Sequence, residues 1–387
     1  MRIATRIIQF VVALLFIVSG LVKANDPLGL AYKMEEFFEL WIAGLKGGHF
    51  FAKGALISFL NFFDHHTLFL SVTMITLEII AGVALLIGWM KTFVLYLLLT
   101  LIVFFTFLTG YAYLSGKFTN CGCFGDCLPI TPLTSFAKDI ILLLLIVFLV
   151  AGQKYIHAFL PRRLSSAVVS LSLVFTLLLQ WYVLNYLPLV DCLPMKKGNN
   201  IAEQIKPPKN AIPSIYETRL VYRNTKTNQL KDMNQTEFND SKIWEDTTWK
   251  WKETQTKLIQ KGTDIPNLQN FSLKTLNGYD STEAILNYPG YSILYFVNPG
   301  STGQLFDKNY WSNKAKQLPV FVITSSPDKF SADSSYSYQV FTTDGTVFRI
   351  AARVNPTIYL LKQGAIINKW PLTKRSEMEK TVSELKK

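Results

Sequence analysis

Two adjacent stretches of the chain decide the fold class. Residues 67–89 read TLFLSVTMITLEIIAGVALLIGW, and residues 92–114 read TFVLYLLLTLIVFFTFLTGYAYL. Each is long enough to cross the hydrocarbon core of a bilayer as a helix, which takes about 20 apolar residues. Neither alternates apolar and polar residues with period two, which excludes a membrane β-barrel. The break at Gly88-Trp89-Met90-Lys91 therefore predicts a hairpin of two transmembrane helices.

Composition extends this membrane part over the first half of the chain. Apolar runs of similar length at Ile3–Val22, Thr134–Ala151 and Leu164–Leu187 bring the predicted spans to five. Residues 1–190 hold 12 Lys and Arg and 8 Asp and Glu, whereas residues 191–387 hold 27 and 19. We therefore expect a membrane half and a water-soluble half, which excludes a cytosolic globular enzyme. The net charge of +12 includes no dense Lys or Arg cluster, so we expect no nucleic-acid binding.

Basic residues in the short loops predict the orientation, because Lys and Arg are enriched in cytoplasmic loops. The basic residues that flank the spans are Arg2, Arg6, Lys91, Lys154, Arg162 and Arg163, which share one side if the N-terminus is cytoplasmic. Residues 23–66, residues 115–133 and everything after 187 then lie outside. Lys23 opens the first of these outer segments, which should form one or two helices on the outer leaflet or a packed cover over the bundle.

All four cysteines fall on this outer side, where disulfides are permitted. Three lie in the sequence Cys121-Gly122-Cys123-Phe124-Gly125-Asp126-Cys127, and Cys192 follows the fifth span. A Cys-x-Cys pair does not easily close an unstrained disulfide, so a bridge to Cys127 or to Cys192 is easier. The four thiols are candidates for a redox relay, and two structural disulfides are the alternative. The spacing is not a common zinc pattern, so we predict no metal site.

Glu78 lies near the middle of the second predicted span. A carboxylate at that depth is costly in lipid, so it should face the bundle interior. We consider it a candidate proton or quinone site, with a structural hydrogen bond between helices as the alternative.

The membrane half also carries a family resemblance. Val18-Ser19-Gly20-Leu21-Val22-Lys23 with Asp26-Pro27, and Leu77-Glu78-Ile79-Ile80-Ala81-Gly82, resemble the first two spans of the DoxX family. Cys121-Gly122-Cys123-Phe124-Gly125 resembles the motif of the related MauE methylamine-utilisation proteins. The resemblance covers about residues 1–150. It implies a four-helix bundle in the bacterial inner membrane, linked to quinone or thiol–disulfide chemistry outside the cytoplasm, and it leaves open whether the chain is an enzyme.

The soluble half divides into two parts. Residues 196–215, rich in Lys, Asn and Pro, predict a linker, and residues 216–260 predict a β-hairpin within a small subdomain. From about Gly262 onward the pattern alternates strands and helices, which indicates an α/β sandwich. The expected elements are strands at Ser292–Val297, Pro319–Thr324, Asn355–Leu361 and Ala365–Trp370, and helices at Gln304–Leu318 and Thr373–Lys386.

This order resembles a thioredoxin-like domain of the TlpA or peroxiredoxin kind over residues 262–386. Asn355-Pro356-Thr357 resembles its cis-proline loop, whereas Asn298-Pro299-Gly300-Ser301-Thr302-Gly303 stands where that family carries Cys-x-x-Cys. The domain contains no cysteine, so it cannot exchange thiols by itself. It also contains no histidine that could activate Ser301. We expect a recognition module instead, whose candidate partner-binding residues are Asn298, Ser301, Asn355, Pro356 and Thr357.

These observations predict four segments. They are a DoxX/MauE-like membrane bundle at 1–152, a fifth span at 153–190, a linker with a small β-rich subdomain at 191–261, and an extracytoplasmic thioredoxin-like domain at 262–387. The first functional hypothesis is assistance of extracytoplasmic thiol–disulfide or quinone-linked redox chemistry through the loop cysteines. The alternative is a non-catalytic membrane anchor or scaffold whose outer domain binds partner proteins. Either requires membrane lipid and an extracytoplasmic protein partner; a quinone is the candidate cofactor of the first.

Overall fold

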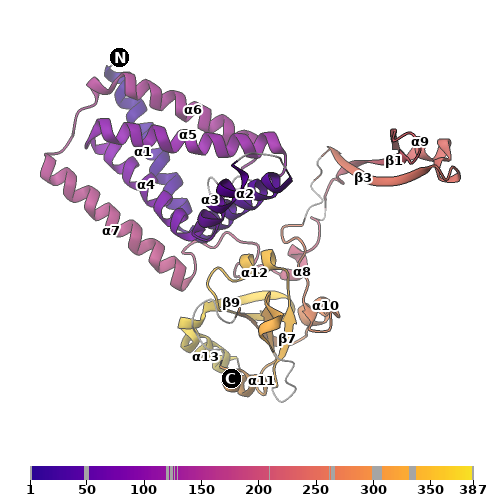
Figure 1. The fold of residues 1–387 in the computed structure, drawn as a ribbon. Coiled ribbons are helices and arrows are strands. Elements are labelled where there is room, and N and C mark those ends of the chain that lie inside the picture. Colours follow the sequence, from indigo (N-terminus) through magenta and orange to yellow (C-terminus); the bar gives the residue numbers. More distant parts are fainter. Residues whose placement is uncertain are drawn as a thin grey trace.

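The structure is a computed structural model whose first half is helical and whose second half is built on two sheets (Figure 1). It describes residues 2–47, 52–118, 122, 125, 127–128, 130–208, 210–260, 262, 266–298, 307–330 and 337–385. Cys121, Cys123 and Ser301, which the sequence singles out, lie outside the described residues.

Five of the helices in the described part of the chain are long and apolar enough to cross a membrane. They are α1 (Arg2–Ala24), α4 (Thr67–Ile87), α5 (Lys91–Ser115), α6 (Pro132–Ala151) and α7 (Arg162–Tyr186). The five predicted spans are thereby confirmed, each within three residues at either end. The α4–α5 hairpin turns at Gly88, whose φ of 72° favours glycine. A Cβ there would also lie 2.7 Å from the carbonyl oxygen of His157.

Small residues let the bundle helices approach closely. An added Cβ at Gly82 of α4 would lie 2.8 Å from Cγ1 of Ile17, and one at Gly20 of α1 would lie 2.5 Å from Cγ1 of Ile79. Membrane helices associate through such small-residue contacts because lipid supplies no hydrophobic drive between them. The closest packing is therefore that of α1 on α4, while α5 packs on α6 and α7 lies against α4.

Two shorter helices occupy the predicted outer segment 23–66. α2 (Pro27–Gly47) packs against α4 and buries Leu30, Met34 and Phe37; the Phe37 ring stacks on that of Phe118 with centroids 4.3 Å apart. α3 (Lys53–Asp64) buries only Leu60. α2 is therefore a cover over the bundle, whereas the exposed apolar side chains of α3 are typical of a helix at a membrane surface.

The first sheet forms an arm that extends away from the rest of the molecule (Figure 1). Its strands are β1 (Ile215–Asn224), β2 (Leu230–Asn234) and β3 (Trp249–Gln260), paired antiparallel in the order β2-β1-β3. The helix α9 (Gln235–Ser241) follows β2 and begins with a capping box between Asn234 and Glu237. A short 3-10 turn, η2 (Ile243–Glu245), leads into β3.

The second sheet has six strands in the order β4-β7-β6-β5-β8-β9. They are β4 (Lys274–Thr275), β5 (Tyr291–Phe296), β6 (Val320–Thr324), β7 (Gln339–Thr342), β8 (Thr357–Lys362) and β9 (Ala365–Pro371). β5, β6 and β7 run parallel, β8 pairs antiparallel with β5, and β9 pairs antiparallel with β8; at the other edge β4 pairs antiparallel with β7. This confirms a sheet-rich C-terminal part, in which sequence reasoning missed the strands β4 and β7.

Helices cover both faces of this sheet because its central strands are apolar on both sides. Ile293 and Tyr295 of β5 pack with Trp311 of α11 (Lys308–Ala315) and with α13 (Arg375–Glu384). The alternate residue Phe296 packs with α12 (Gly345–Ala351). The remaining short elements are α10 (Thr282–Leu286), η1 (Gln153–Tyr155), η3 (Pro327–Lys329) and η4 (Leu372–Lys374).

The predicted linker differs from the structure at its start. Met195 and Ile201 are fully buried in the core of the second sheet, and α8 (Ile201–Gln204) begins there. The backbone also bonds to β9, since the N–H of Gly198 donates to the carbonyl of Ile366 at 2.8 Å. Residues 195–205 therefore belong to the C-terminal fold. Two apolar residues spaced among Lys and Asn are too weak a pattern to predict this.

The N-cap of α12 offers a test of this fold. The Asp344 carboxylate accepts from the N–H of Thr346 at 2.8 Å, and this bond lowers its pKa below the ordinary value of 3.8. Replacing such a cap by Ala costs about 0.5–2 kcal/mol. Asp344→Ala should therefore speed local opening of α12 about 2- to 30-fold at pH 7, measured by amide hydrogen exchange corrected for intrinsic rates.

The pH dependence of the same cap follows from the lowered pKa. The charged cap contributes fully above pH about 3.8 and loses its contribution as pH falls through the lower folded value. Asp344→Asn retains an acceptor without titrating, so its α12 protection should change less between pH 5 and pH 2. Equal acid sensitivity in wild type and Asp344→Asn would contradict this assignment.

Candidate functional site

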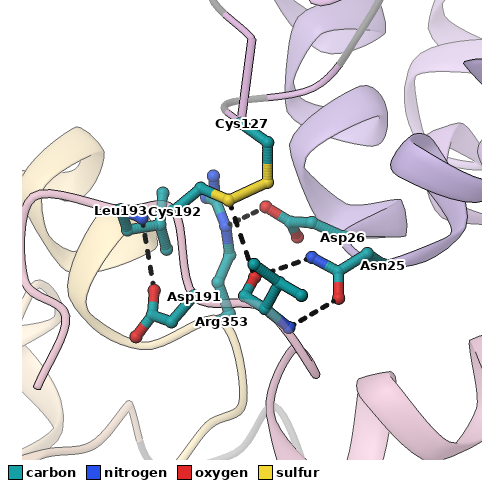
Figure 2. The surroundings of a disulfide bond; sticks show 8 residues. Asn25, Asp26, Cys127, Asp191, Cys192, Leu193 and Arg353 are labelled. Atoms are coloured by element: carbon teal, nitrogen blue, oxygen red, sulfur yellow. Dashed lines mark hydrogen bonds and ion pairs between the residues drawn. A yellow bond between two sulfur atoms is a disulfide. The ribbon is translucent and has the colours of Figure 1, made fainter.

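A disulfide between Cys127 and Cys192 joins the loop after α5 to the segment after α7. Their Cα atoms lie 4.9 Å apart, across 65 residues of sequence. Figure 2 shows Asn25 and Asp26, which follow α1, among the surroundings of this bond. The Asn25 side chain donates to the carbonyl of Val190 at 2.8 Å and accepts from its N–H at 3.0 Å. Three distant segments therefore meet at one end of the bundle.

The Cys-Gly-Cys sequence enters the described structure only through Gly122. A Cβ added at Gly122 would lie 2.9 Å from Cγ of Lys33 on α2, and the φ of this residue is 66°. Lys33 in turn pairs with Glu36 at 2.8 Å. The loop backbone at this position therefore lies against the α2 cover.

Ion pairs clamp the C-terminal part to α2 and to the end of α1. Arg353 pairs with Asp26 at 2.8 Å, and both side chains are largely buried, while Arg349 pairs with Glu35 at 2.8 Å. The Tyr32 ring lies under both guanidinium groups, at 4.9 Å from Arg349 and 5.3 Å from Arg353. Burial raises the pKa of the Tyr32 phenol above its ordinary value of 10.0, although the two arginines oppose this.

A third ion pair lies next to the disulfide. Lys369 of β9 pairs with Asp191, the residue before Cys192. Burial lowers the pKa of Lys369 below its ordinary value of 10.5, and the Asp191 carboxylate partly offsets this effect. Breaking a buried pair on one side leaves an uncompensated charge and costs about 3–5 kcal/mol. These contacts therefore fix the C-terminal fold on the membrane bundle.

Glu78 faces the bundle interior, as the cost of a lipid-facing carboxylate predicts. It is 3% exposed, and both of its carboxylate oxygens accept from Nζ of Lys23, at 2.7 and 3.0 Å. The Lys23 ammonium also lies 4.5 Å from the ring centroid of Phe105. The expectation that Lys23 opens an outer loop is wrong, because α1 continues to Ala24 and buries this lysine. The sequence signal for the burial of Lys23 was that this residue directly follows the apolar run Ile3–Val22.

A second buried pair lies close by. Asp139 of α6 accepts from the Thr109 hydroxyl at 3.0 Å and from Nζ of Lys138 at 2.5 Å. Lys23, Glu78, Lys138 and Asp139 all line one cavity of about 20 Å³. A polar cavity of at least about 10–15 Å³ can hold a water molecule. The site therefore has room for one water between two ion pairs, and this volume does not admit a quinone ring.

Lys23 also lines a second small cavity, which lies under α2. This cavity is likewise about 20 Å³ and includes Lys33, Phe37 and Thr109 in its lining. Polar side chains thus continue from the α2 cover, beside Gly122, to the buried Glu78. Among the residues that the structure describes, no group of three or more His, Cys, Asp and Glu side chains is placed to hold a metal ion.

The predicted partner-binding loops meet at one end of the second sheet. The N–H of Asn298 donates to Oδ1 of Asn355 at 3.0 Å, and Nδ2 of Asn355 donates to the carbonyl of Asn298 at 3.0 Å. The Asn355–Pro356 peptide is cis, as the resemblance implies. Thr357 is fully buried, so its side chain does not reach a surface. Asn298, Asn355 and Pro356 line a cavity of about 590 Å³ that faces the bundle.

Comparison with protein families connects the bundle to a known group. Residues 1–152 match the family model described as methylamine utilisation protein MauE. The match extends from α1 through α6 and ends before α7, so it confirms the MauE-like membrane part predicted from the sequence. Comparisons with curated proteins and with solved structures gave no match. The chain is thus a multi-pass membrane protein with a MauE-like bundle and a sheet-rich C-terminal part.

Because Lys23 and Glu78 pair with each other, replacing one should change how much the other contributes to the free energy of unfolding. Lys23→Met and Glu78→Gln each leave one buried charge without its partner, so each should destabilise the bundle by about 3–5 kcal/mol. The double variant leaves no such charge and should lose less than the two single losses combined. The free energy of unfolding in lipid nanodiscs is measured for all three variants, with a substitution of the exposed Thr100, Thr100→Val, as control. Additive losses would indicate that the two groups act independently.

The disulfide predicts a change in thiol count. Cys192→Ser releases the Cys127 thiol, so alkylation under denaturing, non-reducing conditions should label one more cysteine than in wild type. Cys127→Ser/Cys192→Ser should return to the wild-type count, which assigns the additional label to Cys127 rather than to a change at the other two cysteines. An unchanged count in Cys192→Ser would refute the pairing.

Proposed function

We propose that this protein assists extracytoplasmic thiol–disulfide or quinone-linked redox chemistry through its loop cysteines. The observation that carries the proposal is the position of the Cys127–Cys192 disulfide. It lies where the MauE-like bundle, the segment after α7 and the C-terminal part meet. A half-buried disulfide at such a junction can be reached by the thiol of a second protein.

The proposed exchange proceeds through a mixed disulfide with the partner. A thiolate of a partner dithiol attacks one sulfur of Cys127–Cys192, the other sulfur leaves as a thiolate, and a mixed disulfide forms. The second partner thiol resolves it, so the partner gains a disulfide while Cys127 and Cys192 take up two electrons and two protons. Returning this pair to a disulfide requires a two-electron acceptor. Cys121 and Cys123 are the proposed next dithiol–disulfide couple, because a strained Cys-x-Cys bridge is more oxidising than an unstrained one. A quinone, reduced to quinol with two protons, is the proposed final acceptor.

The buried polar groups are the proposed route for these protons. The Lys23–Glu78 and Lys138–Asp139 pairs line a cavity with space for one water, and ionisable groups inside membrane segments commonly serve proton transfer. The small volume favours protons over a quinone ring at Glu78. A quinone headgroup would instead approach from the lipid side of the bundle.

The C-terminal part is the proposed docking module. Three parallel strands followed by two antiparallel ones, with helices on both faces, support the thioredoxin-like assignment. Because the sequence from 262 to 387 contains no cysteine, recognition rather than exchange is the role proposed for it. Asn298, Asn355 and Pro356 supply the proposed surface; Ser301, proposed with them from the sequence, lies outside the described residues.

A kinetic experiment tests the redox function. Full-length protein in nanodiscs is reduced, freed of reductant without oxygen, and mixed with a water-soluble quinone. Cys127 and Cys192 should reoxidise faster than the cysteines of a matched dithiol peptide, and one quinone should be consumed for each disulfide formed. Glu78→Gln, if folded, should slow this step, whereas Thr100→Val should not. A disulfide that stays oxidised in cells under reducing and oxidising growth conditions would favour the alternative scaffold role, which the ion-pair clamp between the two halves also supports.

The proposed orientation has its own test. If the N-terminus is cytoplasmic, the disulfide and the C-terminal part lie outside in the inner membrane. After reduction of intact spheroplasts, a membrane-impermeant maleimide should label Cys127 and Cys192. Labelling of wild type that appears only after lysis would reverse the assignment, and Cys127→Ser/Cys192→Ser measures any contribution from the other two cysteines.

A further inference from the structure

A short strap, residues 187–195, leads from the last membrane helix to the C-terminal fold and contains Cys192. It begins where α7 ends, after Tyr186, and it ends at Met195, which is fully buried in the core of the second sheet. The strap is therefore the backbone connection between the membrane helices and the C-terminal fold.

The first residue of the strap has a strained backbone. Leu187 has φ 85° and ψ 156°, a combination essentially confined to glycine, and such strain disfavours a conformation by about 5- to 150-fold. Met90 and Lys242 also have positive φ, but their ψ values of 44° and 34° belong to the allowed left-handed region. Leu187 precedes Pro188, and a residue before proline prefers a negative φ with ψ of about 120–160°. Rotation of φ alone would therefore relax Leu187.

Two contacts hold the strap against the bundle. The Asn25 side chain donates to the carbonyl of Val190 at 2.8 Å and accepts from its N–H at 3.0 Å. Two residues further on, the disulfide ties Cys192 to Cys127 in the loop after α5 (Figure 2). Because α7 fixes one end of the segment 187–192 and these contacts fix the other, they impose the conformation that Leu187 would not adopt by itself.

Of these two contacts, the disulfide is the one that responds to a change of redox state. A dithiol that reduces it gives two electrons and two protons, becomes a disulfide itself, and leaves Cys127 and Cys192 as thiols. The two solvent-exposed hydrogen bonds to Asn25 then remain, and each favours the bound strap by about 2- to 13-fold. Together they are of the same size as the strain at Leu187, so neither arrangement dominates once the covalent bond is gone.

The contacts of the strap with the C-terminal fold do not depend on the disulfide. Asp191 pairs with Lys369 of β9, and Leu193 and Met195 are buried. A strap that leaves the bundle therefore stays with the C-terminal fold, and the break occurs on the α7 side of Cys192.

We propose that the strap is a redox-sensitive switch in the tether between the two halves of the chain. While the Cys127–Cys192 bond is intact, Leu187 is held in its strained conformation and the strap lies on the bundle. After reduction, φ of Leu187 rotates to negative values, Val190 leaves Asn25, and the C-terminal fold is less firmly tethered to α7. This inference goes beyond the proposed function, because it applies to any dithiol that reduces the bond, whether or not a quinone reoxidises it.

Amide hydrogen exchange tests the switch, because the N–H of Val190 is itself one of the contacts that break. Full-length protein in nanodiscs is compared with the bond intact and after reduction by a small dithiol, at the same pH. Exchange at Val190 should accelerate at least about fivefold on reduction. The N–H of Gly198 donates to the carbonyl of Ile366 within the C-terminal fold, so its exchange should change less than about twofold.

Two substitutions at Leu187 separate strain from lost packing. Leu187→Gly adopts the observed φ without strain, so its reduced form should exchange at Val190 at least about threefold more slowly than reduced wild type. This factor is smaller than the strain itself, because glycine is also freer in the released strap. Leu187→Ala retains a Cβ and therefore the strain, and it should respond to reduction as wild type does.

A variant without a change at Leu187 keeps the test independent of how those two fold. Cys127→Ser/Cys192→Ser should show the fast Val190 exchange of reduced wild type without any reductant. Cys121→Ser/Cys123→Ser retains the bond and should still respond to the dithiol, which assigns the response to Cys127–Cys192.

Several results would overturn the switch. They are a Val190 exchange rate that reduction leaves unchanged, equal rates in reduced wild type and reduced Leu187→Gly, and acceleration at Gly198 as large as at Val190, which would mean that the whole C-terminal fold loosens. The measurement needs no redox turnover, so a protein that fails to transfer electrons to a quinone would refute the proposed function and leave the switch to be decided by these rates.

Discussion

The buried ion pair between Asp26 and Arg353 is the contact on which the arrangement of the two halves depends. Asp26 follows the first membrane helix, and Arg353 immediately precedes the loop that contains the cis Asn355–Pro356 peptide bond. Either charge alone at this depth would be costly, so the two halves are held together or both groups must return to water. The Tyr32 ring, the Glu35–Arg349 pair and the disulfide reinforce the same junction.

Inside the membrane a similar rule of charge pairing shapes the bundle. Lys23 and Glu78 come from different helices, and their pairing explains how a lysine can lie buried at the end of a transmembrane span. Asp139 follows the same rule with Lys138 and Thr109. Pairing both carboxylates spares the bundle the larger cost of a lone buried charge beside this space for one water.

The sequence was most informative where one physical demand dominated. Lipid requires about 20 consecutive apolar residues for a helix, so all five spans could be predicted with accurate ends. The buried strands β5, β6 and β8 were found because each is a short continuous run of apolar residues. Prediction failed where long-range contacts decide the outcome. Nothing local marks Lys23 as the partner of Glu78, and Ile201 looks like part of a linker until β9 is placed beside it. The choice of Cys192 as the partner of Cys127 also depends on how α7 returns to the loop.

The disulfide has a consequence for the covalent topology of the chain. Cys127 and Cys192 close a ring of polypeptide that contains α6, η1 and α7, so two of the five spans belong to a closed loop. A single cut in the connection at 152–161 would open this ring without separating the pieces while the bond is oxidised. Reduction would then leave the two fragments joined by packing alone. Closing a ring of this length also removes about 4 kcal/mol of chain entropy from an unconstrained unfolded state. The redox state of one bond thus decides whether the protein is topologically a ring with two tails or a linear chain.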